Sequence, residues 1–183
     1  MSQNPEISMS QMLGVVRLAI WGAMMALGAW ISFPVGPVPI TMQTYFLFVA
    51  GFVEGPRAAW AAGLYLLAGL LGLPVFTGAV AGPALMLGPT VGYALSFPLI
   101  AAICGLGRRK PVQSPARLFL FGLIAIAVLY LCGSIGLTFT RGLSLTSAIG
   151  VNLVFIPGDL IKLSAAVAVV MGLAYKRKRF AQV

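Results

Sequence analysis

Histidine is absent from this 183-residue chain, and cysteine and acidic residues are scarce. Without histidine the chain has no Ser-His-Asp triad, no His-ligated zinc and no histidine proton relay. Two distant cysteines and three acidic residues are too few for a metal-ligand cluster. No lysine follows a glycine, so the phosphate-binding loop of ATPases is missing as well. We therefore expect a protein that is not an enzyme and that has no metal or cofactor of its own.

Charged residues are also rare. They make up 8% of the chain, whereas 60% of the residues are hydrophobic, and an average soluble domain has roughly a quarter of its residues charged. This composition predicts an all-α, polytopic membrane protein that forms one domain over residues 1–183. The net charge of +9 comes from residues at the ends of apolar segments, which fits loops that face anionic lipid better than binding of nucleic acid.

Clusters of glycine and proline, together with runs of charge, divide the chain into six predicted transmembrane helices. Their approximate ranges are 12–33, 40–53, 56–73, 91–106, 117–137 and 157–175, between a tail at 1–11 and a basic tail at 176–183. Three prolines between positions 34 and 39 end the first helix. The second helix is short for a bilayer that needs about 20 residues.

The connection at 74–90 is unusual because it is apolar, lacks charge and contains three prolines and three glycines. Irregular apolar backbone at a membrane is tolerated only where protein covers it or where it lines a cavity. Long connections of this kind often act as lids. We expect a lid over a binding site, and the alternative is a packed connector.

An acid and a base enter the last apolar segment together. Pro157 suits the start of a helix, and Asp159 then lies in the first turn, where its carboxylate can accept free backbone N–H groups. Lys162 follows one turn deeper on the same face. Ionisable groups in such segments are costly and usually mark a substrate or ion site. The alternative is an ion pair that only ties two helices together.

Small residues form a stripe along the first helix. Ala19, Gly22, Ala23 and Ala26 recur at helical spacing, which allows another helix to approach closely. This stripe predicts either docking of a partner membrane protein or close packing inside the chain's own helix bundle.

Four ordered motifs resemble the BioY family, the biotin-binding S components of energy-coupling factor (ECF) transporters. They are Gly36–Thr44, Gly72–Phe76, Leu87–Tyr93 and Pro157–Lys162, and the resemblance spans nearly the whole chain. It implies high-affinity capture of biotin from outside the cell and delivery with an energising module. That module would contain a transmembrane coupling protein, docked on the stripe that includes Ala19 and Ala23, and two cytoplasmic ATPases that use ATP.

The resemblance also implies where biotin binds. The family's acid and lysine correspond to Asp159 and Lys162, and its third external loop corresponds to the 74–90 connection. The other candidate binding residues are Thr77, Gln43, Tyr93 and Asn152 for the urea of biotin, with Phe76 and Tyr93 covering its ring. Asp159 can accept the urea N–H groups, or Lys162 can pair with the carboxylate, and both assignments stay open.

Two rival functions fit the same residues. In a self-sufficient proton-coupled carrier, Asp159 would carry the coupling proton and Lys162 would keep it ionised. In a membrane scaffold that transports nothing, the same pair would be structural. Uptake in cells that lack a coupling partner would favour the carrier, and absence of small-molecule binding would favour the scaffold.

Positive charge predicts the orientation in the cell membrane. Ten lysines and arginines lie at positions that are cytoplasmic if the N-terminus is inside, whereas the external connections hold only Arg141. Both termini are then cytoplasmic. A single cysteine at position 178, with Cys104 and Cys132 replaced, should resist an impermeant thiol reagent added outside intact cells. Ready labelling from outside would overturn this topology.

Overall fold

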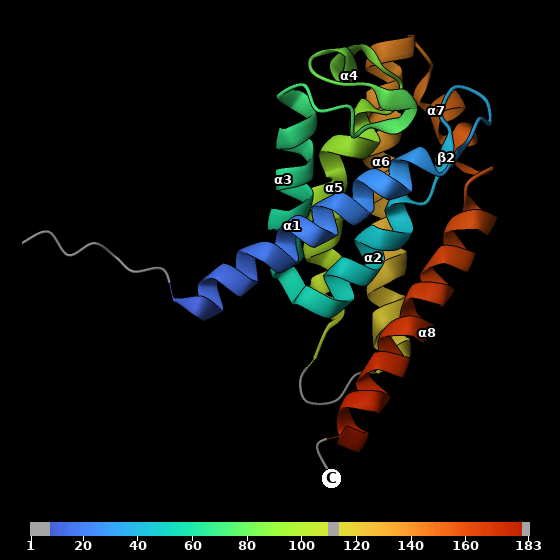
Figure 1. Cartoon of the computed structure of the whole chain (residues 1–183). Helices are drawn as coiled ribbons and strands as arrows, with labels where there is room; N and C mark the ends of the chain where they lie inside the picture. Colours follow the sequence, from blue (N-terminus) through green and yellow to red (C-terminus); the bar gives the residue numbers. More distant parts are fainter. Residues whose placement is uncertain (1–7, 110–113, 181–183) are drawn as a thin grey trace, which may run out of the picture.

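The computed structural model describes residues 8–109 and 114–180 (Figure 1). This part of the chain is mostly helical, with one short antiparallel ladder that pairs Ser32 with Thr41. In chain order the elements are α1 (Met9–Trp30), β1 (Ser32–Phe33), β2 (Ile40–Thr41), α2 (Gln43–Glu54), η1 (Gly55–Arg57), α3 (Ala58–Leu70), η2 (Thr77–Ala79), α4 (Ala84–Leu87), α5 (Val91–Gly107), α6 (Pro115–Arg141), α7 (Leu145–Asn152) and α8 (Ile156–Phe180).

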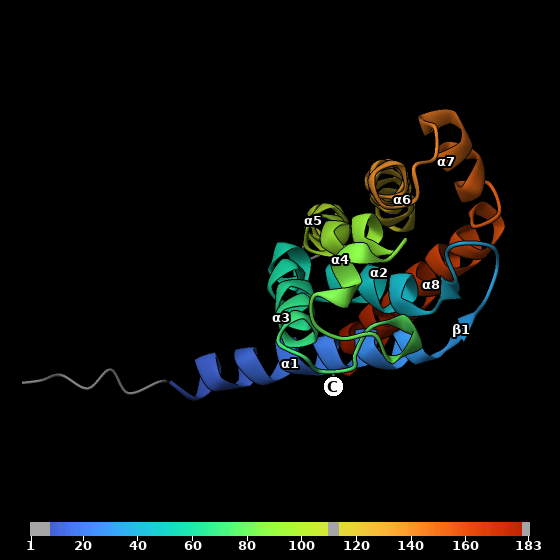
Figure 2. The same cartoon turned by 90° about the horizontal axis from the view of Figure 1, so that it is seen from above.

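Helix α5 lies at the centre of the bundle, where it packs against α6, α2 and α3 (Figures 1 and 2). Helix α1 crosses α2 and α3 obliquely, and α8 packs against α2 and α6. Large fully buried side chains such as Phe48, Phe52 and Ile100 fill the space between α2 and its neighbours. The short elements α4 and α7 are both at the upper end of the bundle in Figure 1, on different sides of α6 (Figure 2).

Capping residues explain where the first helix begins. The Ser8 side chain accepts a hydrogen bond from the Gln11 backbone N–H, and the Gln11 side-chain oxygen accepts one from the Ser8 N–H, which forms a capping box. Helix α1 therefore starts at Met9, so the prediction of a loose tail over 1–11 is wrong for residues 9–11. The helix also ends at Trp30, before the predicted limit of 33, because the chain turns into β1.

Two helical segments differ from their predicted limits near α6. Helix α6 continues past 137 to Arg141. In this last turn the Thr138 and Thr140 hydroxyls donate hydrogen bonds to backbone carbonyls four residues earlier, so both hydroxyls have partners within the helix. Ser144 then caps α7, a helix that the sequence did not predict.

The 74–90 connection contains the short elements η2 and α4, and α8 extends into the predicted basic tail as far as Phe180. Residues 1–7, 110–113 and 181–183 of the predicted tails and connections lie outside the described residues.

Within the described residues, α1, α6 and α8 up to Tyr175 are long and apolar enough to cross a membrane. Helix α5 is apolar but has 17 residues, and the 12 residues of α2 extend for only about 18 Å, against roughly 30 Å of hydrocarbon. The six predicted spans and the cytoplasmic termini therefore stay predictions. Figure 1 places the start of α1, η1, the end of α5 and the end of α8 toward one end of the bundle.

Two glycines allow α5 and α6 to touch through their backbones. A Cβ atom on Gly92 would overlap the Cys132 carbonyl oxygen and would lie 2.9 Å from the Gly136 Cα atom. Glycine is required here by contact between helices, which is a common use of small residues in membrane proteins.

We predict that Gly92→Ala lowers the melting temperature of the ligand-free protein, because α5 and α6 must separate to accept the methyl group. Gly63→Ala in α3 is the matched control, since nothing lies within 4 Å of a Cβ atom there and alanine favours a helix over glycine by about 1 kcal/mol. Thermal melting in detergent measures both variants. Equal melting temperatures would show that the contact between α5 and α6 tolerates a side chain.

Candidate substrate pocket

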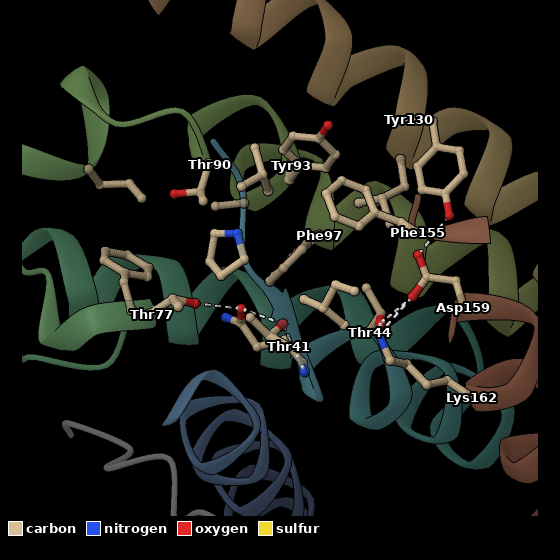
Figure 3. Close-up of a pocket in the computed structure, with 18 residues that line it drawn as sticks. Thr41, Thr44, Thr77, Thr90, Tyr93, Phe97, Tyr130, Phe155, Asp159 and Lys162 are labelled. Atoms are coloured by element: carbon tan, nitrogen blue, oxygen red, sulfur yellow. Dashed lines mark hydrogen bonds and ion pairs between the residues drawn. The ribbon is translucent and has the colours of Figure 1, made fainter. Parts of the chain in front are cut away.

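A pocket lies between α2, α5, α6, α8, the β2 strand and the 74–90 connection (Figure 3). Two groups of polar side chains line it, one around Asp159 and the other around Gln43. Apolar side chains line the space between the two groups: Phe76, Leu85, Phe97, Leu129 and Phe155. The pocket therefore offers two polar ends and an apolar middle.

Asp159 and Lys162 form an ion pair at one end of this pocket. The Lys162 Nζ atom lies 2.9 Å from Asp159 Oδ1, and the two side chains are only 11% and 6% exposed. Thr44 of α2 donates a hydrogen bond to Asp159 Oδ1 at 3.1 Å, and Tyr130 of α6 donates one to Oδ2 at 2.9 Å. The lysine also donates to the Thr44 hydroxyl at 3.3 Å. Three helices thus supply the groups that compensate one buried carboxylate.

The hydrogen-bond partners of the Asp159 carboxylate differ from those that the sequence predicts. Within the described residues, its hydrogen bonds come from the side chains of Lys162, Thr44 and Tyr130 and not from backbone N–H groups of the first turn. Asp159 is the fourth residue of α8, past the capping position from which a carboxylate folds back onto the helix end. Its side chain is therefore free to point sideways into the pocket, as Figure 3 shows.

Gln43 organises the opposite polar end. Its Oε1 atom accepts hydrogen bonds from Thr41 at 3.1 Å and from Thr77 at 3.2 Å, and its Nε2 atom donates to the Tyr65 hydroxyl at 2.6 Å. Tyr65 in turn donates to the Val75 carbonyl at 3.0 Å. One buried amide therefore connects the β2 strand, α3 and the start of the 74–90 connection.

The 74–90 connection forms a wall of the pocket. Phe76 is buried, lines the pocket and packs edge-to-face on Tyr65 with ring centroids 5.5 Å apart. Its ring occupies the position where Gly69 of α3 lacks a side chain. Thr77 also lines the pocket, so the structure brings both candidate residues of this connection to the predicted site.

The cavity volume is ≈ 70 Å³, below the 300–1,000 Å³, approximately, that is usual for ligand pockets. The cavity as it stands is therefore smaller than a ligand that would reach both polar ends.

Asn152 is the one candidate binding residue that the structure does not bring to the pocket lining. Its side chain is buried behind Tyr93, whose hydroxyl donates a 2.6 Å hydrogen bond to Asn152 Oδ1. Direct contact between Asn152 and a ligand therefore stays a prediction. Asn152 is the last residue of α7, a helix that the sequence did not predict. Tyr93 itself lines the pocket.

The sequence analysis missed several pocket residues. Thr44 and Tyr130 hold the carboxylate of Asp159, and Phe97 and Phe155 line the apolar middle. Thr44 ends one of the motifs quoted above, and Tyr130 is a lone hydroxyl in a long apolar run. A search for isolated polar groups in apolar helices would have found both.

The small-residue stripe of α1 borders a second, apolar groove. Its walls are the stripe residues Ala19, Gly22, Ala23 and Ala26 with Leu64, Tyr65 and Ala68 of α3 and Leu73 and Val75 of the following connection, and its volume is ≈ 670 Å³. Gly22 faces α3, where a Cβ atom would lie 3.6 Å from the Ala61 carbonyl oxygen. Ala19 and Ala23 are exposed, whereas Gly22 and Ala26 are partly buried. The stripe thus contacts α3 at Gly22 and borders an open apolar groove between α1 and α3.

Comparison with known proteins assigns the chain to one family. A model of the BioY family matches residues 1–179. The chain belongs to the BioY family. A probable biotin transporter BioY of Pyrococcus horikoshii is 40% identical over 156 residues, which cover 85% of this chain and 92% of the relative. The biotin transporter BioY of Thermotoga maritima is 36% identical over 161 residues, covering 87% and 94%.

A solved structure has the same fold as this BioY-family chain. The crystal structure of the S-component for biotin from an ECF-type ABC transporter matches with a TM-score of 0.83 and 29% identity. The match covers 93% of this chain and 94% of the other. The helical arrangement around the pocket is therefore the S-component fold.

Proposed function

We propose that this chain takes up biotin as the substrate-binding membrane subunit of an ECF transporter. The observation that carries the proposal is the buried pair of Asp159 and Lys162 at one polar end of a mostly apolar pocket, in a chain of the BioY family. The relatives are named as transporters, and the chain acts in transport, not as an enzyme.

Biotin has a chemical shape that suits this pocket. Its urea carries two N–H donors and a carbonyl acceptor, its fused rings are apolar, and its chain ends in a carboxylate. Asp159 uses three hydrogen bonds of the roughly four that a carboxylate accepts, and Lys162 uses two of its three donors. Each therefore keeps capacity for one bond to a ligand. Gln43 and Thr77 supply the second polar end.

Ligand entry requires a wall to open, and the 74–90 connection is the wall we assign to this movement. The walls formed by α2, α5, α6 and α8 pack against one another. The connection is held at its start by hydrogen bonds from Thr77 to Gln43, from Tyr65 to the Val75 carbonyl and from Trp30 to the Pro74 carbonyl. Opening it means breaking these side-chain hydrogen bonds and moving Phe76 away from the Tyr65 ring. Biotin then enters from the side of the membrane that faces α4 and α7.

The energy for release comes from other subunits in this proposal. A transmembrane coupling protein docks in the groove bordered by the α1 stripe, and two cytoplasmic ATPases use ATP. Six membrane-crossing segments with both termini cytoplasmic complete the arrangement in the cell membrane. The exposure of Ala19 and Ala23 beside an open apolar groove supports docking at this surface.

We predict that Asp159→Asn and Lys162→Met each weaken biotin binding by about 100-fold or more, which corresponds to about 2.7 kcal/mol. Removing one member leaves the other charge buried and unpaired, a loss that typically costs about 3–5 kcal/mol when burial is complete. Asp159→Asn should lower the melting temperature of the ligand-free protein less than Lys162→Met, since it keeps the side-chain shape. Ser164→Ala, on the exposed face of α8, is the control that should bind as wild type.

Calorimetric affinity and a ligand-free melting curve for each variant separate the possible roles of the pair. A purely structural pair gives two destabilised variants whose folded fraction binds biotin normally, and that result would remove Asp159 and Lys162 from the site. Weaker binding of dethiobiotin and absent binding of thiamine by the wild type are the expected specificity controls.

We predict that a ligand-side comparison identifies the end of biotin that faces Lys162. If Lys162 pairs with the carboxylate, biotin methyl ester binds wild type much more weakly than biotin does, and Lys162→Met abolishes that difference. If the pair holds the urea, the methyl ester loses the same affinity relative to biotin in wild type and in Lys162→Met. An equal loss of affinity in the two proteins would therefore place the carboxylate at the Gln43 end.

We predict that Ala23→Leu prevents association with the coupling protein while biotin binding by the isolated chain stays normal, because leucine adds bulk to the close-approach surface. Ala19→Leu should behave in the same way. Ala168→Leu adds the same bulk to an exposed position of α8 and should change neither property. Co-purification measures association. Loss of biotin binding by folded Ala23→Leu would instead assign the stripe to packing within the chain.

A further inference from the structure

The Asn152 side chain is buried and has hydrogen-bond contacts on both of its polar atoms. It is 3% exposed, lies outside the pocket lining and accepts the Tyr93 hydroxyl at 2.6 Å. Its Nδ2 atom lies 2.8 Å from the Ser134 hydroxyl, 3.3 Å from the Tyr130 carbonyl and 3.4 Å from the Ala148 carbonyl. Both polar atoms of the amide therefore have partners inside the protein.

The Tyr93 contact determines which part of that residue meets the pocket. The Tyr93 hydroxyl points away from the pocket centre toward Asn152, so the ring is what lines the cavity (Figure 3). The ring packs edge-to-face on Phe155, with centroids 6.4 Å apart. It also fits against α6 at Gly133, where a Cβ atom would overlap it. The hydrogen bond thus fixes an aromatic wall of the pocket in one orientation.

The position of Asn152 in the chain extends its influence to the ion pair. Asn152 is the last residue of α7, which packs against α6. Its backbone carbonyl accepts the Phe155 N–H at 2.9 Å, and the Phe155 carbonyl accepts the Asp159 N–H at 2.9 Å. The tight turn from α7 into α8 (Figure 2) therefore begins at an anchored residue, and its backbone hydrogen bonds continue to the N–H of Asp159 in the first turn of α8.

We propose that Asn152 is a positioning residue that sets the pocket for its ligand by holding the ring of Tyr93 and the start of α8 in place, without contacting the ligand itself. This inference rests on the proposed function, because the ligand used to test it is biotin. It differs from a purely structural role, since loosening the amide changes the shape of the pocket wall and not only the free energy of unfolding.

A double-mutant cycle tests the inference on the full chain in lipid nanodiscs. Asn152→Leu removes the amide at similar volume, and Tyr93→Phe removes only the hydroxyl that reaches it. We expect Asn152→Leu to weaken biotin binding about tenfold, equivalent to 1.4 kcal/mol. Tyr93→Phe alone should weaken binding by about threefold to tenfold. Adding it to Asn152→Leu should change affinity by less than about twofold, because the two side chains act as one unit.

Multiplication of the two separate effects in the double variant would overturn the proposal, because it would mean that Tyr93 and Asn152 act on the ligand independently. Normal affinity of folded Asn152→Leu with a lowered melting temperature would also overturn it and would leave a structural role. Ser134→Ala removes one partner of the amide without touching the pocket. It should weaken binding about threefold or less, and it keeps the test available if Asn152→Leu does not fold.

A second measurement needs no ligand. 3-Fluorotyrosine placed at position 93 should give one sharp fluorine resonance in the otherwise wild-type chain and a broadened or split one in Ser134→Ala and Asn152→Leu. The same label at Tyr45, whose hydroxyl has no hydrogen bond to the described residues, should be unaffected. An unchanged resonance at position 93 in both variants would refute the positioning role. If wild type fails to bind biotin, the proposed function fails and this measurement still decides the role of Asn152.

Discussion

The compensation of one buried carboxylate determines how three helices meet in this protein. A charged aspartate in an apolar interior is tolerated only if paired and hydrogen-bonded. Asp159 of α8 obtains its partners from Lys162 of the same helix, Thr44 of α2 and Tyr130 of α6. Any arrangement that separates α8 from α2 and α6 removes the Thr44 and Tyr130 hydrogen bonds and leaves the carboxylate with Lys162 alone. The energetic need of a single side chain therefore fixes the geometry of one end of the pocket before any ligand arrives.

The opposite end of the pocket depends on neutral groups, and this difference has a functional consequence. Gln43, Thr77 and Tyr65 exchange uncharged hydrogen bonds, each of which contributes only about 0.5–1.5 kcal/mol net. Breaking them is far cheaper than separating the ion pair. A cavity of ≈ 70 Å³ must open to admit a ligand with two polar ends, and opening at the neutral end leaves the charged end assembled. The pocket thus combines one end held by an ion pair with another end held by neutral hydrogen bonds.

The sequence alone was sufficient to single out residues whose type is rare in an apolar segment. An acid and a lysine in an apolar run are conspicuous because burying them is costly and they usually mark a functional site, so Asp159 and Lys162 could be found without a structure. The hydroxyls of Thr44 and Tyr130 are chemically ordinary, and their role depends on which helices approach one another, a property that no local pattern encodes. Asn152 was predicted to bind the ligand directly, whereas the structure places it behind Tyr93 at the end of α7, a helix that the sequence did not predict. The positions of the two central polar residues were therefore predictable, whereas the set of neighbours that makes them a site was not.

Small residues illustrate the same limit of sequence patterns. The stripe of α1 and the glycines of α5 and α6 all permit close approach of helices, but their surroundings differ. At Gly92 and Gly136 the space that a side chain would occupy is taken by the backbone of the other glycine, so these two glycines serve packing within the fold. Gly22 has Tyr65 and Ala61 of α3 at ordinary contact distance, and Ala19 and Ala23 beside it remain exposed. A pattern can indicate that a helix offers a flat surface, but only the packed structure separates surfaces that the chain fills from those left for another molecule.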